Sequence, residues 1–184
     1  MPWVFLYSDL EPAALATTLG RAPFVSLPAS LPKYQISFKG KSRKWGGGLA
    51  TLEKKSKAWV YGSIHLLPPE DIKKLDSYYS YFKKIVVPIL IDATQDKVKA
   101  ETYIIKDATY ADPSDEYIKA MLKHLKFFWG QEGAGKPSLE TFGISAEAPK
   151  QKRKKLEEAA PESENPVSEK PKKTRKTRRR TKKV

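Results

Sequence analysis

The sequence contains no cysteine and only two histidines, His65 and His124. Without cysteine, the chain cannot form a disulfide, a thiolate nucleophile or a cysteine-ligated zinc site. Two histidines are too few for a histidine-rich metal site, and we predict neither a metal nor another cofactor. No run approaches 18 apolar residues, and the N-terminus has no basic segment followed by an apolar one. We therefore predict no membrane span and no signal peptide, and we expect a cytoplasmic protein.

The basic residues are unevenly distributed along the 184 residues, which carry a net charge of +14. Residues 150–184 contain 15 Lys and Arg against 5 Glu, and no aromatic residue. Such a segment cannot bury enough apolar area to offset its chain entropy, so we predict a disordered tail. The chain then divides into a folded domain at residues 1–130, a linker at 131–149 and a low-complexity basic tail at 150–184.

Hydrophobic periodicity and Pro/Gly punctuation predict an α+β domain with a closed or strongly curved sheet. Asp9 is the expected N-cap of the first helix, and the strand at 85–91 is expected to be buried on both faces with the next strand antiparallel to it. Three prolines, Pro23, Pro28 and Pro32, predict an extended linker. The predicted strands are 2–6, 33–39, 49–52, 59–66, 85–91 and 97–105, and the predicted helices are 11–19, 71–79 and 114–129.

Five short segments in order resemble the γ-glutamylcyclotransferase-like (AIG2-like) family over roughly residues 3–129. Leu31–Phe38 is similar to the family's L-P-x-Y-x-L-x-F strand, and Trp45–Leu52 to its W-G-G-G-x-A-T segment. Val60–Leu67 and then Leu75–Ser80 resemble its V-x-G-x-x-x-x-L and L-D-x-x-E-G elements. Pro113-Ser114, followed by Tyr117 and Leu122, resembles its last helix. The resemblance implies a small mixed β-barrel with flanking helices.

The resemblance also implies where the chemistry of the family takes place, and those positions differ here. Tyr79 stands where L-D-x-x-E-G has its general acid/base Glu, and a tyrosine with a pKa near 10 is a poor base at neutral pH. The family's opening turn, Y-G-S-N-L, corresponds to Leu6-Tyr7-Ser8-Asp9-Leu10. Tyr7 replaces the Gly, and Asp9 places a charge that repels a substrate carboxylate. We predict no catalytic residue and a vestigial pocket formed by Leu6, Tyr7, Ser8, Asp9, Leu10 and Tyr79.

Within that pocket, the Tyr79 ring is expected to fill the substrate space and Tyr7 to narrow the entrance. The alternative is an active γ-glutamyl cyclotransferase or a related γ-glutamylamine-cleaving enzyme that uses another carboxylate. Asp76 is expected to brace its turn instead, and two other acids are expected at the surface. Neither histidine is expected to take part, since one lies on a strand and the other on a polar helix face. The two surface acids are Glu53 and Asp92, and the histidines are His65 and His124.

Basic clusters predict a nucleic-acid-binding function, because many closely spaced cations gain affinity for phosphates by counterion release. We predict a non-enzymatic domain that binds nucleic acid through its tail, with RNA favoured over DNA. The expected partner is structured RNA in a ribonucleoprotein or ribosomal subunit. We expect no membrane binding. Two interpretations are open for the aromatic set Tyr78, Tyr79, Tyr81 and Phe82: the rings either stack on bases or plug the pocket. Loop 39–44 and the tail could also be solvated segments that bind nothing. The predicted contacts are Lys39, Lys41, Arg43, Lys44, Lys83, Lys84, Lys150, Lys152, Arg153, Lys154, Lys155, Lys172, Lys173, Arg175, Lys176, Arg178, Arg179, Arg180, Lys182 and Lys183.

Overall fold

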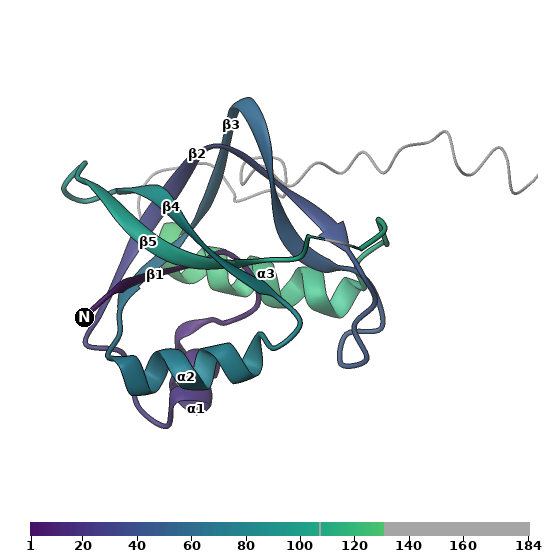
Figure 1. Cartoon of the computed structure of the whole chain (residues 1–184), viewed down its shortest axis with the longest axis horizontal. Coiled ribbons are helices and arrows are strands. Elements are labelled where there is room, and N and C mark those ends of the chain that lie inside the picture. The colour runs from purple at the N-terminus through teal and green to yellow at the C-terminus, as the bar shows by residue number, and fades with distance from the viewer. Residues whose placement is uncertain (107, 131–184) are drawn as a thin grey trace, which may run out of the picture. The chain divides into compact units, whose positions relative to one another are not determined.

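Five strands close into a barrel in the computed structural model, which describes residues 1–106 and 108–130 (Figure 1). Around the barrel the strands follow the order β1-β3-β2-β4-β5, with β1 parallel to β5 and every other pair antiparallel. The sheet is therefore mixed, and the predicted small mixed β-barrel is confirmed. The strands are β1 (Trp3–Leu6), β2 (Val25–Lys39), β3 (Leu49–Leu66), β4 (Lys83–Ile91) and β5 (Lys97–Ile104).

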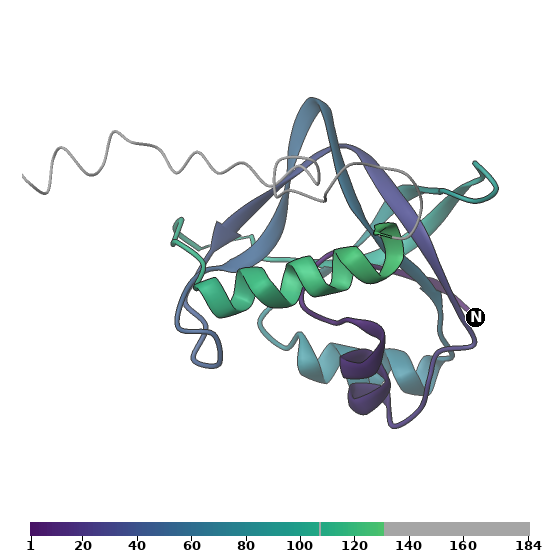
Figure 2. The ribbon, with the colours of Figure 1, turned by 180° about the vertical axis from the view of Figure 1, so that it is seen from behind.

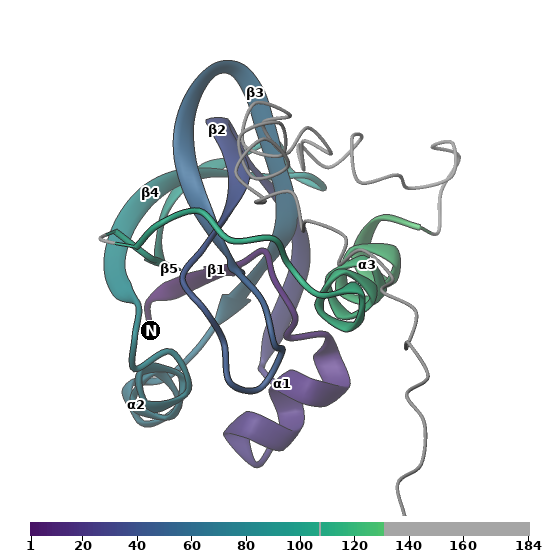
Figure 3. The same ribbon diagram turned by 90° about the vertical axis from the view of Figure 1, so that its right-hand side faces the viewer.

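Three helices cover the barrel: α1 (Pro12–Leu19), α2 (Pro69–Tyr78) and α3 (Asp115–Trp129). α1 and α2 lie beside each other on one side, whereas α3 runs along another face (Figures 2 and 3). The α3 boundaries follow the sequence pattern, because Ser114 caps its N-terminus by accepting a hydrogen bond from the Tyr117 backbone N–H at 3.3 Å. No helix in the described residues is long and apolar enough to cross a membrane.

The predicted proline-punctuated linker is wrong, because β2 already begins at Val25 and runs for 15 residues. β2 pairs with both β3 and β4 only at Ala29 and Ser30. Pro28 and Pro32 lie outside this doubly paired part, so the N–H group that each proline lacks removes little of the hydrogen bonding in the sheet. A register shift follows Pro32, at Lys33, which has a φ of +65°. Proline here bends a long strand instead of preventing it.

Residues 49–66 form one 18-residue strand where the sequence predicted two shorter ones. Leu49–Lys54 pairs with one half of β2 and Trp59–Leu66 with the other, so residues 55–58 (Lys-Ser-Lys-Ala) form a bulge within β3. The prediction that the strand at 85–91 is buried on both faces is also wrong. Val86 is 63% exposed, because β4 faces the barrel interior on one side only. Its antiparallel pairing with β5 is confirmed.

The core consists of two hydrophobic clusters with β1 between them. Phe5 on β1 belongs to the cluster inside the barrel, which also receives Met121 from α3. Val4 and Leu6 point to the other cluster, beneath α1 and α2. Gly62 on β3 allows this packing, since a Cβ there would lie 2.3 Å from the Leu6 carbonyl oxygen. A side chain at position 62 would therefore displace β1.

Both histidines belong to a buried hydrogen-bond chain, which contradicts the prediction that His124 lies on a polar helix face. His124 follows Tyr117 and Met121 at helical spacing, so it shares their buried side of α3. Its Nδ1 lies 2.7 Å from the Leu10 carbonyl oxygen, which only accepts, so Nδ1 donates. The neutral ring then accepts at Nε2 from the Ser63 hydroxyl at 3.1 Å.

The chain continues from Ser63 to His65, whose Nε2–H donates to the Ser63 Oγ at 2.7 Å. The Ser26 hydroxyl completes it by donating to His65 Nδ1 at 2.9 Å. Every group has one consistent role when both rings are neutral. Burial, together with the nearby His124, lowers the pKa of His65 to about 3, and burial lowers the pKa of His124 as well.

We predict that acidification below about pH 6.5 destabilises the fold through these histidines. Their pKa values are lower in the folded than in the unfolded chain, so the stabilisation is complete above the unfolded pKa near 6.5. The His65 contribution is lost as the pH falls toward 3, at about 1.4 kcal/mol per pH unit, and the His124 contribution is lost in the same direction. Urea unfolding between pH 7 and pH 4 should show this loss.

The control is His65→Gln, which removes one titrating ring but leaves the carboxylates unchanged. The free energy of unfolding of this variant should depend less steeply on pH than that of the original chain, by about 1.4 kcal/mol per unit between pH 6 and pH 4. Equal slopes in the two proteins would show that His65 is not held neutral in the fold.

Candidate functional site

The predicted vestigial pocket lies at one mouth of the barrel, where three segments meet. The loop after β1 supplies Ser8 and Asp9, the end of α2 supplies Tyr78 and Tyr79, and the loop between β2 and β3 supplies Lys44 and Trp45. Two of these segments are fixed by the core, since β1 is buried on both faces and α2 packs through Ile72 and Leu75.

Tyr79 is part of the packed core at this mouth, with 5% of its surface exposed. Its ring stacks on Tyr103 at 4.5 Å between centroids, and Phe82 contacts it edge-on at 5.1 Å. Its hydroxyl lies 3.1 Å from the Ser8 Oγ. The space left beside Ser8 and Tyr79 measures about 10 Å³, which leaves room for one water at most.

The position of Tyr79 determines its protonation state. Burial raises the pKa of the Tyr79 phenol well above its usual value of 10, and the nearby Asp9 charge raises it further. The phenol is therefore neutral at physiological pH. A neutral phenol in a filled space cannot take a proton from a substrate amine, which is the task of a general base.

Tyr7 lines the small space beside Ser8 and Tyr79, and it does so from within the barrel. That it narrows an entrance stays a prediction. Its ring joins the barrel cluster, where it stacks on Phe5 at 6.1 Å. Its hydroxyl donates to the Tyr103 carbonyl oxygen at 2.5 Å, so the side chain is anchored inside the barrel. The alternation of a strand explains this placement, because Phe5 and Tyr7 are two residues apart and face the same side.

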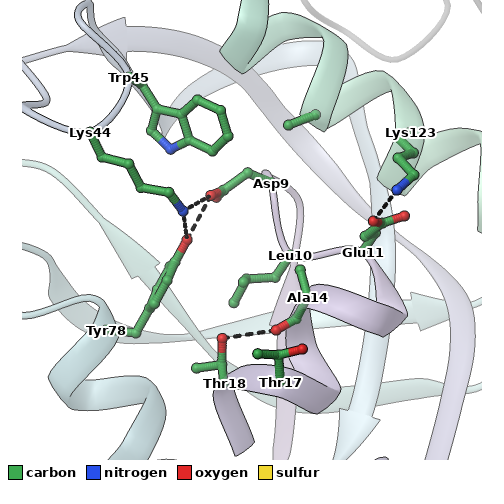
Figure 4. Close-up of a pocket in the computed structure, with 11 residues that line it drawn as sticks. Asp9, Leu10, Glu11, Ala14, Thr17, Thr18, Lys44, Trp45, Tyr78 and Lys123 are labelled. Carbon is green, nitrogen blue, oxygen red and sulfur yellow. Dashed lines mark hydrogen bonds and ion pairs between the residues drawn. The ribbon is translucent and has the colours of Figure 1, made fainter.

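Asp9 is not the N-cap of α1, which begins after Glu11 and has no side-chain cap. The Tyr78 hydroxyl donates to Asp9 Oδ2 at 2.7 Å, and the Lys44 ammonium lies 3.8 Å from the same oxygen (Figure 4). Lys44 also donates to the Tyr78 oxygen at 3.1 Å. We call these three side chains the clasp. Burial and the Asp9 charge together raise the pKa of the Tyr78 phenol far above 10.

The clasp separates two cavities, and Trp45 lines both of them. Figure 4 shows the smaller one, of about 400 Å³, where Lys123 pairs with Glu11 on its far side. The larger one is an open groove of about 920 Å³ that continues past Tyr79. Asp9 is the one carboxylate among the described residues that line this groove, whereas its cations are Lys39, Lys41, Arg43, Lys44, Lys83 and Lys106.

Five of the lysines and arginines predicted to bind nucleic acid therefore meet in one place: Lys39, Lys41, Arg43, Lys44 and Lys83. Lys84 does not join them. It points to the other side of β4, where it pairs with Asp76 at 2.8 Å and Glu101 at 3.4 Å. Adjacent strand residues face opposite sides, so only one of the pair Lys83-Lys84 could line the groove. The predicted contacts from Lys150 to Lys183 lie outside the described residues.

Sequence analysis missed Lys106, which follows β5 and reaches the groove only because the barrel closes. A single lysine after a strand has no distinctive pattern. The rings predicted either to stack on bases or to plug the pocket differ in their placement. Tyr79 plugs the pocket, whereas Tyr81 is 90% exposed at the groove.

The other acids considered for catalysis lie away from Ser8. The sequence predicts that Asp76 caps or braces its own turn. In the structure it accepts a hydrogen bond from the Tyr103 hydroxyl at 2.7 Å and pairs with Lys84, so it links α2 to β5 and β4. Glu53 pairs with Lys39 at 2.9 Å. Among residues 1–106 and 108–130, no three His, Cys, Asp or Glu side chains are grouped so that they could hold a metal ion.

Comparisons with known proteins agree on the fold. A solved structure described as a gamma-glutamyl cyclotransferase matches with a TM-score of 0.65 at 19% identity, covering 91% of this chain and 94% of that chain. A crystal structure of an uncharacterized protein (loc79017) from Homo sapiens matches with a TM-score of 0.64 at 19% identity, covering 91% and 93%. The solution structure of At5g39720.1 from Arabidopsis thaliana gives 0.52 at 18% identity, covering 85% and 86%.

A search of curated proteins found no match. The family model described as "Gamma-glutamyl cyclotransferase, AIG2-like" matches residues 4–121, which include the loop after β1, Tyr79 and the first seven residues of α3. This match spans more than half of the chain and, apart from Leu122, covers each segment whose motif resembled the family. The protein therefore belongs to the gamma-glutamyl cyclotransferase, AIG2-like family.

Proposed function

We propose that this protein is a catalytically silent member of its family that binds nucleic acid, with RNA favoured over DNA. The observation that carries the first half is the Tyr79 phenol, buried and hydrogen-bonded to Ser8 where the family resemblance places a carboxylate. The reaction needs a group that accepts and then returns a proton near neutral pH, and this phenol does neither.

The charge of the groove supports the second half of the proposal. Lys39 pairs with Glu53, and Lys44 pairs with Asp9. The other four cations, Lys41, Arg43, Lys83 and Lys106, have no ion-pair partner among the described residues. Exposed cations gathered around a hollow attract a polyanion, and the aromatic rings beside them offer surfaces for bases.

The C-terminal sequence extends the same argument. Residues 150–184 add 15 Lys and Arg against 5 Glu, and the last cluster, Lys170–Lys183, contains no acid. Such a segment neutralises many phosphates without requiring a fixed shape. We propose structured RNA in a ribonucleoprotein or ribosomal subunit, in the cytoplasm, as the partner, with the tail providing most of the affinity and the groove the local contacts.

Asp9 gives a reason to consider a second function. It lines the groove beside Tyr79 and is the one carboxylate there in the part of the chain that the structure describes. An enzyme that uses Asp9 as its acid and base could still cleave a γ-glutamyl amine. Release of 5-oxoproline from γ-glutamyl substrates by the intact protein, abolished by Asp9→Asn, would favour this function over the silent domain.

We predict that RNA binding by the intact chain falls steeply with salt. With six to ten phosphate contacts, the affinity should drop about 10³- to 10⁵-fold between 50 and 200 mM salt. Deletion of residues 150–184 should flatten this dependence, because each lost phosphate contact removes about 0.7 to 0.9 from the logarithmic slope. Fluorescence anisotropy with an RNA hairpin and the DNA hairpin of the same sequence measures both the slope and the preference for RNA.

Charge-matched double variants separate the groove from general charge. Lys41→Gln with Arg43→Gln removes two groove cations, whereas Lys54→Gln with Lys55→Gln removes two exposed cations on β3 away from it. The first pair should weaken binding more than the second. Salt-insensitive binding or no binding would contradict the proposed RNA binding. Equal losses in the two variants would contradict a specific role for the groove.

We predict that Tyr79→Glu does not restore cyclotransferase activity. Removing the ring enlarges the space of about 10 Å³ beside Ser8, but Tyr7 and Asp9 still occupy the turn that holds the substrate according to the family resemblance, and the Asp9 charge still repels a substrate carboxylate. The variant should lose at least about 3 kcal/mol of stability, because a carboxylate replaces packed aromatic surface. Urea unfolding measures the loss and 5-oxoproline release the activity.

The matched control is Tyr79→Phe, which keeps the ring and removes only the hydrogen bond to Ser8. It should cost about 1 kcal/mol. Tyr79→Phe should keep the RNA affinity of the original chain. Tyr79→Glu should still bind RNA through the untouched tail, with an affinity lowered by the negative charge added to the groove, provided that binding is measured at a temperature where it remains folded. Turnover by Tyr79→Glu would show that the pocket still accepts a γ-glutamyl group.

A further inference from the structure

The groove contains one feature that a site for phosphates alone would not need, which is Asp9. A negative charge weakens the binding of a polyanion, and in this groove it is surrounded by cations. The Asp9 side chain is only 5% exposed, with Oδ2 held by the other two members of the clasp. Oδ1 has no hydrogen-bond partner among the described residues. The carboxylate is thus held in place, and its Oδ1 can accept a further hydrogen bond.

Lys44 covers this carboxylate without being part of the core. Its side chain is 62% exposed, and its ammonium lies 4.6 Å from the Trp45 ring and 5.3 Å from the Tyr78 ring (Figure 4). An ion pair at 3.8 Å on an exposed lysine is weak and is easily exchanged for a phosphate. When Lys44 moves to a phosphate, two aromatic rings and the Asp9 carboxylate become available together.

We propose that this place binds a single unpaired guanine of the RNA. The base stacks on the Trp45 or Tyr78 ring, its N1–H and N2–H donate to the Asp9 carboxylate, and Lys44 turns to a neighbouring phosphate. Aromatic stacking combined with hydrogen bonds to the Watson–Crick edge is how proteins recognise unpaired bases. The inference rests on the proposed RNA binding and adds to it a preference for one base.

The chemistry of a carboxylate selects guanine over the other bases. Guanine presents two adjacent donors on its Watson–Crick edge, which match the two oxygens of a carboxylate. Adenine and cytosine place a ring nitrogen acceptor next to their amino group, and uracil flanks its N3–H with two carbonyls. Each of those acceptors would face the negative charge of Asp9. A well-placed bidentate pair typically discriminates between bases by about 5- to 100-fold.

The experiment uses the full chain and four RNA pentamers, UUGUU, UUAUU, UUCUU and UUUUU, with affinity measured by anisotropy at fixed salt. UUGUU should bind at least about 5-fold more tightly than each of the others. Asp9→Asn should reduce this ratio to near one, because an amide cannot accept from both donors. The same variant should raise the affinity for UUUUU, because a negative charge leaves the groove. Opposite changes for the two pentamers distinguish a base contact from a loss of folding.

The matched control is Glu11→Gln, which removes a carboxylate from the smaller cavity on the other side of the clasp. It should leave the guanine preference unchanged. Equal binding of the four pentamers, or the same loss of preference in Glu11→Gln and Asp9→Asn, would overturn the inference. If the full chain binds RNA with a steep salt dependence but without a base preference, the proposed function stands and only the guanine site fails. If it binds no RNA, both fail.

Discussion

The structure depends on β1 being buried on both faces. Phe5 and Tyr7 belong to the cluster inside the barrel, whereas Val4 and Leu6 belong to the cluster beneath α1 and α2. A short strand can serve both because its side chains alternate, and because Gly62 leaves room for its backbone against β3. β1 also closes the barrel by pairing with β3 on one side and β5 on the other. The loop that follows, with Ser8 and Asp9, is therefore positioned by the most constrained segment of the chain.

Tyr79 fills, as a packed side chain, the position at which the family resemblance places a carboxylate. Its ring joins α2 to β5 through Tyr103, and its hydroxyl joins α2 to the loop after β1 through Ser8. A carboxylate at this place would require water or a substrate to solvate it, whereas a buried neutral phenol requires only one hydrogen bond. The exchange closes the space beside Ser8 and leaves the groove outside it open. A fold shared with gamma-glutamyl cyclotransferases therefore does not establish that reaction here.

The charge of the groove is largely independent of the forces that hold the barrel together. Lys41, Arg43, Lys83 and Lys106 are exposed and contribute little to the core, so their number and sign could vary without unfolding the chain. The clasp is different, since the Asp9 side chain is only 5% exposed whereas that of Lys44 is 62% exposed. This combination of a buried acceptor, two aromatic rings and an exposed cation distinguishes the groove from an ordinary basic surface.

Elements whose pattern is local can be predicted from the amino-acid sequence. α3 has its stripe, its Ser114 cap and its terminal Gly130 within seventeen residues, and the substitution at Tyr79 is visible in a short motif. The family motifs also predicted the mixed barrel. Within the described residues, most of the errors concern features that distant segments decide, whereas the wrong N-cap of α1 is a local one.

Only the tertiary structure showed that β2 and β3 are long and bent, because a paired neighbour holds prolines and polar residues in a strand that they would not form alone. Only barrel closure decided that Lys106 joins the groove and that Lys84 faces away. Tyr7 and His124 became buried because other elements cover the faces on which they lie. Burial is a property of two surfaces in contact, and a sequence pattern describes one of them at a time.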